Sequence, residues 1–266
     1  MADQQAGCYT SSMHSLDFRS VENALAGCRW GHTLFTYDSI GSTMDRAREL
    51  AQKGAREGTL VIAAEQTEGR GRLNRAWISP AGSLYLSILL YPDAEKLPYL
   101  TVLAGLAVAE AIEEVTSIHT DLKWPNDVLI RGKKVAGILV ESGVSKTRNY
   151  TVIGMGINVN IQTGSCLEIA GIATSLSDHI GRPVDPLALL RALIDRLEFL
   201  YSSFDQNAIL KLWKSRLITL GRRVKATSGT SVFEGAAIDV NSDGALIIRR
   251  DDGTECAVVA GDVTLG

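Results

Sequence analysis

Residues 123–141 read KWPNDVLIRGKKVAGILVE, and this stretch decides how the middle of the chain folds. Val128–Ile130 and Val135–Val140 are apolar runs separated by Arg131-Gly132-Lys133, a pattern that predicts a β-hairpin. Further apolar runs on both sides predict more strands of the same sheet. They are Leu34–Tyr37, Thr59–Ala64, Leu84–Tyr91 and Tyr150–Ile157.

Helical patterns separate these strands. Ser42 and Thr43 can cap a helix whose apolar positions recur at helical spacing and which Gly54 ends. The other expected helices are Asp17–Ala26, Leu100–Val115, one from Pro186 (capped by Asp185) to Leu200, and Asp205–Leu220. The alternation of both element types predicts a mixed α and β domain.

After Gly221 the apolar period changes from helical to two. Short runs alternate with Ser-Gly and Asp-Gly turns, which predicts a small all-β barrel of four or five strands. The expected strands are Arg223–Ala226, Ser231–Val240, Ala245–Arg250 and Glu255–Val259. We therefore divide the chain into an N-terminal extension (1–30), a large domain (31–220) and a small C-terminal domain (221–266).

The composition is that of a globular protein. The 266 residues are 45% hydrophobic and 21% charged, and a formal net charge of -3 gives no overall sign of nucleic-acid binding. The most apolar stretch, Tyr99–Ala109, is shorter than the roughly 20 residues of a membrane span. The cysteines, Cys8, Cys28, Cys166 and Cys256, are scattered, and no secretory signal is evident. We expect a cytoplasmic protein without a membrane partner.

Residues 66–77, QTEGRGRLNRAW, combine three arginines with two glycines after a buried strand. Glycine lets the backbone approach a ligand, and arginine presents a planar fork to carboxylate or phosphate oxygens. Such a loop could fold over a small anion and exclude water. A solvated basic loop and an RNA-contacting segment remain alternative interpretations.

Three shorter features also carry possible chemistry. Asp127 could hold Mg²⁺ and Asn126 could bind an amide or base edge, although Asn-Asp also forms plain turns. Lys134 could point inward as a fixed positive charge beside a phosphate, although a hairpin lysine more often faces solvent. Gly137 would leave room for a ligand against the sheet.

The stretch Gly154-Met-Gly-Ile-Asn158 places two glycines in an apolar strand, which indicates a bulge or a close approach of the backbone. No third glycine lies in register, so the pattern does not predict a dinucleotide-binding fold. Ser42 and Thr43 could contact a polar ligand, or could serve only as a helix cap.

Taken in this order, the segments resemble those of the biotin–protein ligase family, and the resemblance runs from about Leu34 to the C-terminus. It implies an α+β fold: a mixed-sheet catalytic domain of the biotin/lipoate ligase type, followed by a small SH3-like β-barrel. It also implies that biotin and ATP, with Mg²⁺, form biotinoyl-AMP. The biotin then passes to a lysine of a biotin carboxyl carrier protein domain.

The resemblance implies roles residue by residue. Lys134, Arg70 and Arg72 would be catalytic, because they neutralise the biotin carboxylate and the α-phosphate. The biotin site would comprise Ser42, Thr43, Met44, Gln66, Arg70, Gly71, Arg72, Lys134 and Gly137. The adenylate site would comprise Arg72, Arg75, Trp77, Lys123, Asn126, Asp127, Lys134 and Asn158, with Asp127 as the metal ligand.

The sequence departs from the family pattern in three places. Met44 stands where many members have asparagine, and the loop reads Arg72-Leu73-Asn74-Arg75 where members commonly have Arg-Gly-Arg. Gly266 stands where some members continue to an arginine. The family also includes DNA-binding repressors, but the N-terminal extension is too short for a winged helix. We expect a ligase that binds no DNA and that could form a homodimer.

Two other functions remain open. A lipoate–protein ligase or octanoyltransferase shares the fold and also modifies a lysine. The arginine-rich residues 66–77 and the Lys-Trp-Pro-Asn-Asp segment, however, favour biotin as the substrate. A non-catalytic biotin- or nucleotide-binding regulator would not need the arginines together with Lys134.

Overall fold

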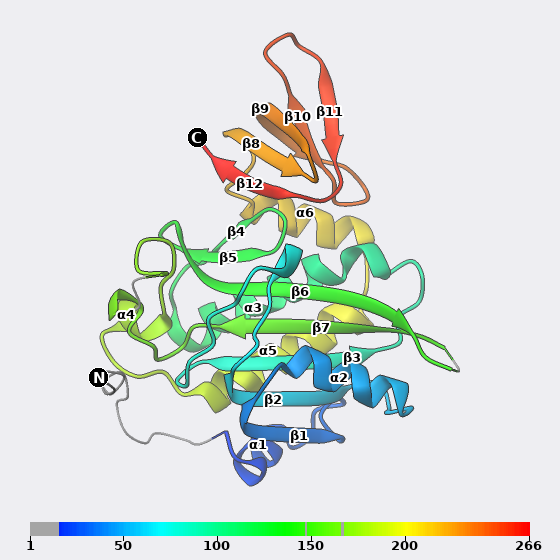
Figure 1. Ribbon diagram of the computed structural model, residues 1–266, viewed down its shortest axis with the longest axis vertical. Helices are drawn as coiled ribbons and strands as arrows, with labels where there is room; N and C mark the ends of the chain where they lie inside the picture. The colour runs from blue at the N-terminus through cyan, green and yellow to red at the C-terminus, as the bar shows by residue number, and fades with distance from the viewer. Residues whose placement is uncertain (1–15, 147, 166–167) are drawn as a thin grey trace, which may run out of the picture.

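The computed structural model describes residues 16–146, 148–165 and 168–266, which form a large layered part and a small β part (Figure 1). The large part contains a seven-stranded sheet in the order β1-β2-β3-β7-β6-β5-β4, in which β1 and β2 are parallel and the other neighbours antiparallel. The strands are β1 (Leu34–Ile40), β2 (Thr59–Gln66), β3 (Leu84–Leu90), β4 (Asp121–Lys123), β5 (Asp127–Ile130), β6 (Lys133–Val144) and β7 (Asn149–Ile157). The predicted mixed sheet is confirmed.

Both faces of this sheet are covered, because its strands are apolar on both sides. Val61, Leu89 and Val152 pack under α2 (Thr43–Gln52) on one face. Their neighbours along each strand, such as Leu60 and Ile88, point the other way and join the main core. That core lies under α3 (Leu100–Thr116) and α5 (Pro186–Ser202), which Figure 1 shows behind the sheet.

The helices begin where the sequence places capping side chains. Ser42 accepts a hydrogen bond from the Asp45 backbone N–H, and Asp185 precedes Pro186 at the start of α5. The remaining helices are α1 (Phe18–Ala24), α4 (Leu176–Ile180) and α6 (Gln206–Arg216). The prediction for the last of these was too long. Leu217 leaves the helix because it forms a bridge with Leu122 of β4.

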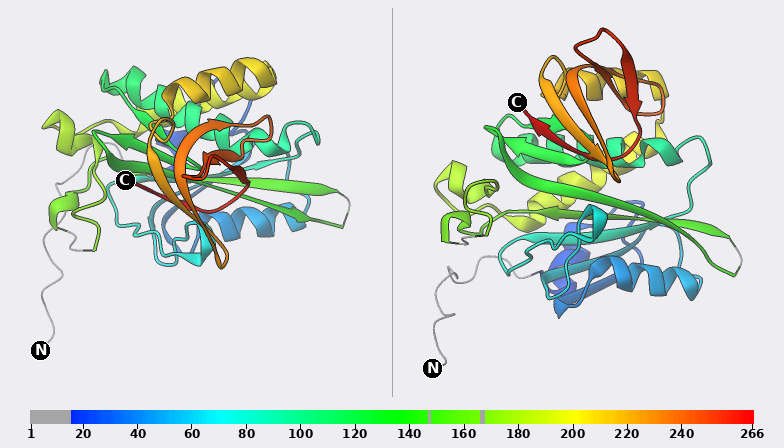
Figure 2. Two further views of the ribbon diagram at one scale, coloured as in Figure 1. Left: turned by 90° about the horizontal axis from the view of Figure 1, so that it is seen from above. Right: turned by 45° about the horizontal axis from the view of Figure 1, so that its top comes forward.

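The small β part follows α6 and lies beside the edge of the large sheet formed by β4 and β5 (Figure 1 and Figure 2). Its five strands are all antiparallel and run in the order β11-β10-β9-β8-β12. They are β8 (Arg223–Ser228), β9 (Ser231–Val240), β10 (Leu246–Arg249), β11 (Glu255–Val258) and β12 (Asp262–Leu265). The expected four or five short strands are confirmed, whereas β12 is a strand that the sequence pattern did not separate from the others.

Trp124 fixes the small part to the large one. Its backbone N–H donates to Thr219 Oγ1 at 3.0 Å, and its indole N–H donates to the Gly244 carbonyl at 2.9 Å. The side chain is 1% exposed, and its peptide bond to Pro125 is cis. Trp124 and Pro125 thus form an anchored turn between β4 and β5.

Cys28 and Cys256 are free thiols, while Cys8 and Cys166 lie outside the described part of the chain. Among those same residues, no helix combines the length and the apolar character that crossing a bilayer requires.

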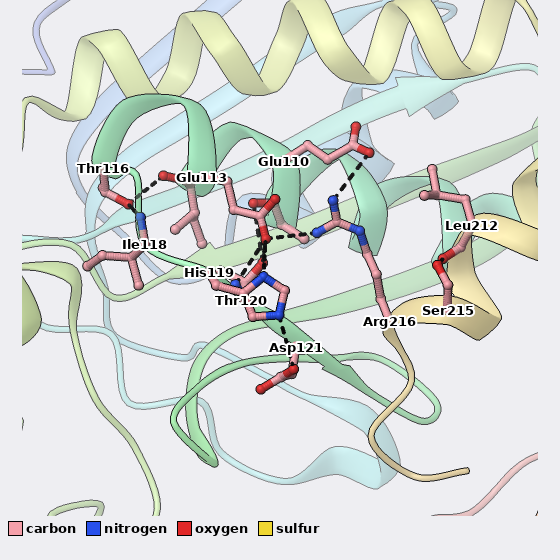
Figure 3. A network of polar contacts seen from close by, with 12 residues as sticks. Glu110, Glu113, Thr116, Ile118, His119, Thr120, Asp121, Leu212, Ser215 and Arg216 are labelled. Atoms are coloured by element: carbon pink, nitrogen blue, oxygen red, sulfur yellow. Dashed lines mark hydrogen bonds and ion pairs between the residues drawn. The ribbon is translucent and has the colours of Figure 1, made fainter.

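A polar network joins α3 to α6 just before the chain enters the small part (Figure 3). Glu113 accepts hydrogen bonds from the Thr120 N–H at 3.0 Å, the Thr120 hydroxyl at 2.9 Å and Arg216 Nη1 at 2.8 Å. Burial raises the pKa of Glu113, but the hydrogen bonds from Arg216 and Thr120 outweigh it and hold the pKa below its ordinary value. The ionised carboxylate therefore stabilises the fold.

We expect Glu113→Gln to lower the free energy of unfolding by about 2 kcal/mol at neutral pH, because hydrogen bonds to a charged acceptor are stronger than those to a neutral one. A depressed carboxyl pKa contributes stability above the unfolded value of about 4.3, and that stability is lost as the pH falls through the folded value. Denaturant unfolding of wild type and variant should therefore converge in acid. The exposed neighbour Glu114→Gln is the control, and a gap between wild type and E113Q that persists in acid would contradict this role.

Candidate active site

A cavity of about 780 Å³ opens on the α2 face of the large sheet, beneath β12. Its volume is in the usual range for a small-molecule site. All of the residues that the sequence analysis proposed for the site contribute to its wall. They are Ser42, Thr43, Met44, Gln66, Arg70, Gly71, Arg72, Arg75, Trp77, Lys123, Asn126, Asp127, Lys134, Gly137 and Asn158.

Residues 69–77, here called the arginine loop, form a closed turn after β2. The Gly71 N–H donates to the Arg75 carbonyl at 2.8 Å, and the Trp77 N–H donates to the Gly69 carbonyl at 2.9 Å. Leu73 and Asn74, which depart from the family pattern, both have positive φ, at 55° and 58°. Asn74 can take this conformation because its short polar side chain can hydrogen-bond locally, whereas Leu73 takes it without such a side chain.

Each arginine of the loop has a partner outside it. Arg70 Nη2 lies 2.5 Å from Asp45 Oδ1 in the first turn of α2. Arg72 Nη1 donates to the Gly261 carbonyl at 2.9 Å, and Arg75 pairs with Asp262 at the start of β12. The loop is thus held between α2 and the small β part, with its cations at the cavity wall.

The guanidinium of Arg72 is half-buried and lies near two carboxylates. Burial lowers the pKa of Arg72, and the carboxylates of Asp262 and Asp127 oppose that shift. A half-buried guanidinium close to two carboxylates remains charged, and it can bind an anion through charge-assisted hydrogen bonds.

The inner end of the cavity is polar and has few spare hydrogen-bonding groups. The Thr43 N–H and hydroxyl both donate to Gln66 Oε1, at 2.9 and 3.0 Å, and the Ser87 hydroxyl donates to Thr43 Oγ1 at 2.9 Å. Gln66 Nε2 in turn donates to Ser79 Oγ at 3.1 Å. The helix-cap interpretation of Ser42 is confirmed, and its own hydroxyl hydrogen is still available to a ligand.

The glycines of β6 and β7 make room for two side chains. A Cβ on Gly154 would lie 2.6 Å from Met44 Sδ, so Met44 fills the space that this glycine leaves. Gly137 and Gly156 face each other in register, and a Cβ on Gly156 would lie 2.6 Å from Trp77 Nε1. The space expected over Gly137 is thus occupied by two side chains. A Cβ added to Gly137 would lie 3.0 Å from Trp77 and 3.1 Å from Lys134.

Lys134 points inward, as the sequence analysis proposed. Its Nζ lies 2.6 Å from Asp127 Oδ1 and 4.8 Å from the centre of the Trp77 ring. Its backbone is fixed on both sides, because its N–H donates to Ile172 and its carbonyl accepts from Thr174. A cation so held can stabilise negative charge that develops in the cavity.

The two amides proposed for the adenylate also hold the wall of the cavity. Asn126 Nδ2 donates to the Ile138 carbonyl at 2.7 Å, and Asn158 Nδ2 donates to the Thr174 carbonyl at 3.0 Å. Both donors are bound to backbone, and Asn158 is 3% exposed. These residues therefore position β6 and the segment before α4, and Lys123 lies beside them in the wall.

Three parts of the site were not predicted from the sequence. Residues 262–265 of β12 and 171–173 line the cavity, and Asp45 holds Arg70 from outside it. The first two come from distant parts of the chain and have no motif of their own. Asp45 was hidden by its role as an ordinary acidic residue in the first turn of a helix.

The sequence matches the biotin/lipoate A/B protein ligase family over residues 36–158 and the biotin protein ligase C-terminal domain over residues 219–266. It is 38% identical over 244 residues to the bifunctional ligase/repressor BirA of Bacillus subtilis, covering 89% of this chain and 75% of that protein. It is 34% identical to the biotin–[acetyl-CoA-carboxylase] ligase of Mycobacterium tuberculosis, covering 93% and 95% of the two chains.

Solved structures show the same likeness. A biotin protein ligase from Aquifex aeolicus, in complex with biotin and ATP, superposes with a TM-score of 0.76 at 33% identity. The match covers 89% of this chain and 99% of that one, so it includes both the large sheet and the small β part.

We expect Gly156→Ala to push the Trp77 indole off the sheet, because the added methyl group and Nε1 cannot both occupy their places. Overpacking of this kind costs about 1–3 kcal/mol. Acrylamide quenching of Trp77 fluorescence should increase, since the other tryptophans, Trp30, Trp124 and Trp213, are buried. Gly164→Ala, where the Cβ meets open space, is the control. Unchanged quenching in G156A would show that Trp77 does not rest on this glycine.

Proposed function

The chain belongs to the biotin/lipoate A/B protein ligase family, and on that premise we propose that it is a biotin–protein ligase. It would activate biotin with ATP and transfer it to a lysine of a biotin carboxyl carrier protein domain. One observation supports this most strongly: a single cavity combines a polar inner end, the arginine loop and the Lys134–Asp127 pair. The M. tuberculosis relative carries the name of this activity.

The cavity matches a ligand with a polar ring at one end and a carboxylate at the other. Ser42, Thr43 and Gln66 would bind the ureido ring of biotin at the inner end, where Thr43 can exchange its bonds to Gln66 for bonds to the ligand. Met44 and Trp77 would contact the apolar part between them. The carboxylate would then lie at Arg70 and Arg72, which supply charged donors.

In the first step a carboxylate oxygen of biotin attacks the α-phosphorus of ATP. The new C(=O)–O–P bond forms as the bond to the β-phosphate oxygen breaks, and pyrophosphate leaves. Lys134 and Arg72 would lie beside the α-phosphate and stabilise its charge in the transition state. The fixed backbone of Lys134 means that little reorganisation is required during the reaction.

The residues of the cavity are compatible with Mg²⁺ bound mainly through phosphates. No cluster of three acidic, histidine or cysteine side chains suited to a metal occurs in the parts of the chain described above. Magnesium, however, commonly uses one or two carboxylates together with substrate phosphates and water. Asp127 would be its protein ligand, and the ion would neutralise phosphate charge when bound.

In the second step the uncharged amine of the acceptor lysine attacks the acyl carbon of biotinoyl-AMP. The amide bond forms as the bond between the acyl carbon and the phosphate oxygen breaks, AMP leaves, and the nitrogen releases one proton to solvent. The arginine loop and β12 would keep water from the mixed anhydride until the acceptor arrives.

Cys28 and Cys256, as free thiols, agree with a reducing compartment such as the cytoplasm.

The direct test is pyrophosphate release and mass gain on a biotin carboxyl carrier domain, with biotin and ATP both required. Lys134→Gln should lower the rate of adenylate formation by about 100-fold, because one fixed charge beside the phosphate is lost. Lys133→Gln, at an exposed neighbouring position, is the matched control. Transfer of lipoate instead of biotin, or full activity in K134Q, would contradict the proposal.

A further inference from the structure

Arg70 is the loop arginine that is tied to the large part of the molecule. Its guanidinium lies 2.5 Å from Asp45, and the two side chains are 32% and 33% exposed. Arg72 and Arg75 instead contact Gly261 and Asp262 in the small β part. In these contacts Arg70 is therefore held by α2, whereas Arg72 and Arg75 are held by the small β part.

Asp45 is itself held in place from several sides. Its backbone N–H donates to Ser42 Oγ, which fixes it in the first turn of α2, where a helix stabilises negative charge. Its Oδ1 also pairs with Arg48, and Arg48 Nη1 lies 3.2 Å from Glu141 of β6. Charges alternate along this row, which joins the arginine loop through α2 to the large sheet.

The position of Asp45 shows how it can act. Arg70 lines the cavity, whereas Asp45 does not and lies behind it, next to Thr43 and Met44. A guanidinium has five N–H donors, so a bond through one of them leaves others for an anion in the cavity. Asp45 can therefore orient Arg70 without taking the ligand's place.

We propose that Asp45 is a positioning residue for the ligase reaction, which holds Arg70 over the cavity and so retains the activated acyl-adenylate until the acceptor lysine arrives. This inference rests on the proposed function, because the adenylate is the molecule to be retained. Asp45 contributes no group to the cavity wall, and it acts only through Arg70.

The first test measures the fate of biotinoyl-AMP in Asp45→Asn, which keeps the shape and removes the charge. A bond between charged groups is worth about tenfold in an equilibrium. We expect about tenfold faster escape of the adenylate and a higher biotin KM, with a much smaller change in kcat. Asp45→Glu should recover part of the loss, because the charge is restored.

A double-variant comparison separates positioning from a general structural effect. If Asp45 acts through Arg70, Arg70→Ala should cause the same escape, and D45N in an R70A background should add almost nothing. Glu49→Gln, one turn along α2 and paired only with Arg46 in the described contacts, should retain the adenylate as wild type does. Additive losses from D45N and R70A would overturn the proposal.

A second readout does not depend on activity. Trypsin cleaves after arginine, and the loop offers Arg70, Arg72 and Arg75. We expect D45N to be cut in residues 69–77 several times faster than wild type or E49Q without ligand, while its Tm stays close to wild type. If wild type makes adenylate and D45N matches it in both retention and cleavage, only the role of Asp45 fails. If wild type makes no adenylate, the proposed function fails. Equal cleavage of wild type and D45N would in that case also show that Asp45 does not hold the arginine loop.

Discussion

The site depends on holding three arginines close together at the wall of one cavity. Like charges repel, and Leu73 and Asn74 both have positive φ, which is unfavourable for residues other than glycine. The structure meets this constraint by pairing Arg70 with Asp45 and by placing Arg72 and Arg75 against β12. The small β part is therefore a component of the site, because two of the three cations rest on it.

A second constraint is the space needed above β6 and β7 for two large side chains. Met44 and Trp77 can approach β6 and β7 this closely only because Gly154, Gly137 and Gly156 have no Cβ. The buried indole N–H of Trp77 has no hydrogen-bond partner among the described residues. A ligand group that accepted this hydrogen would recover a lost hydrogen bond on binding.

Much of this architecture could be predicted from the sequence, because the apolar period and the turn residues locate most helices and strands. The segments that resemble the ligase family locate the cavity wall. Three features could not be predicted. The bridge of Leu217 to Leu122 shortens α6 through a tertiary contact that no local pattern records. The space over Gly137 was assigned to a ligand, although Trp77 occupies it. Asp45 and Asp262 act at a distance in sequence from the arginines they hold, so their roles appear only after folding.

The most direct measurement is a crystal structure with a non-hydrolysable analogue of biotinoyl-AMP. We expect the ring at Thr43 and Gln66, the acyl phosphate between Arg72 and Lys134, and the arginine loop closed between α2 and β12. An analogue bound elsewhere, or a loop turned to solvent with Lys134 far from the phosphate, would contradict this expectation.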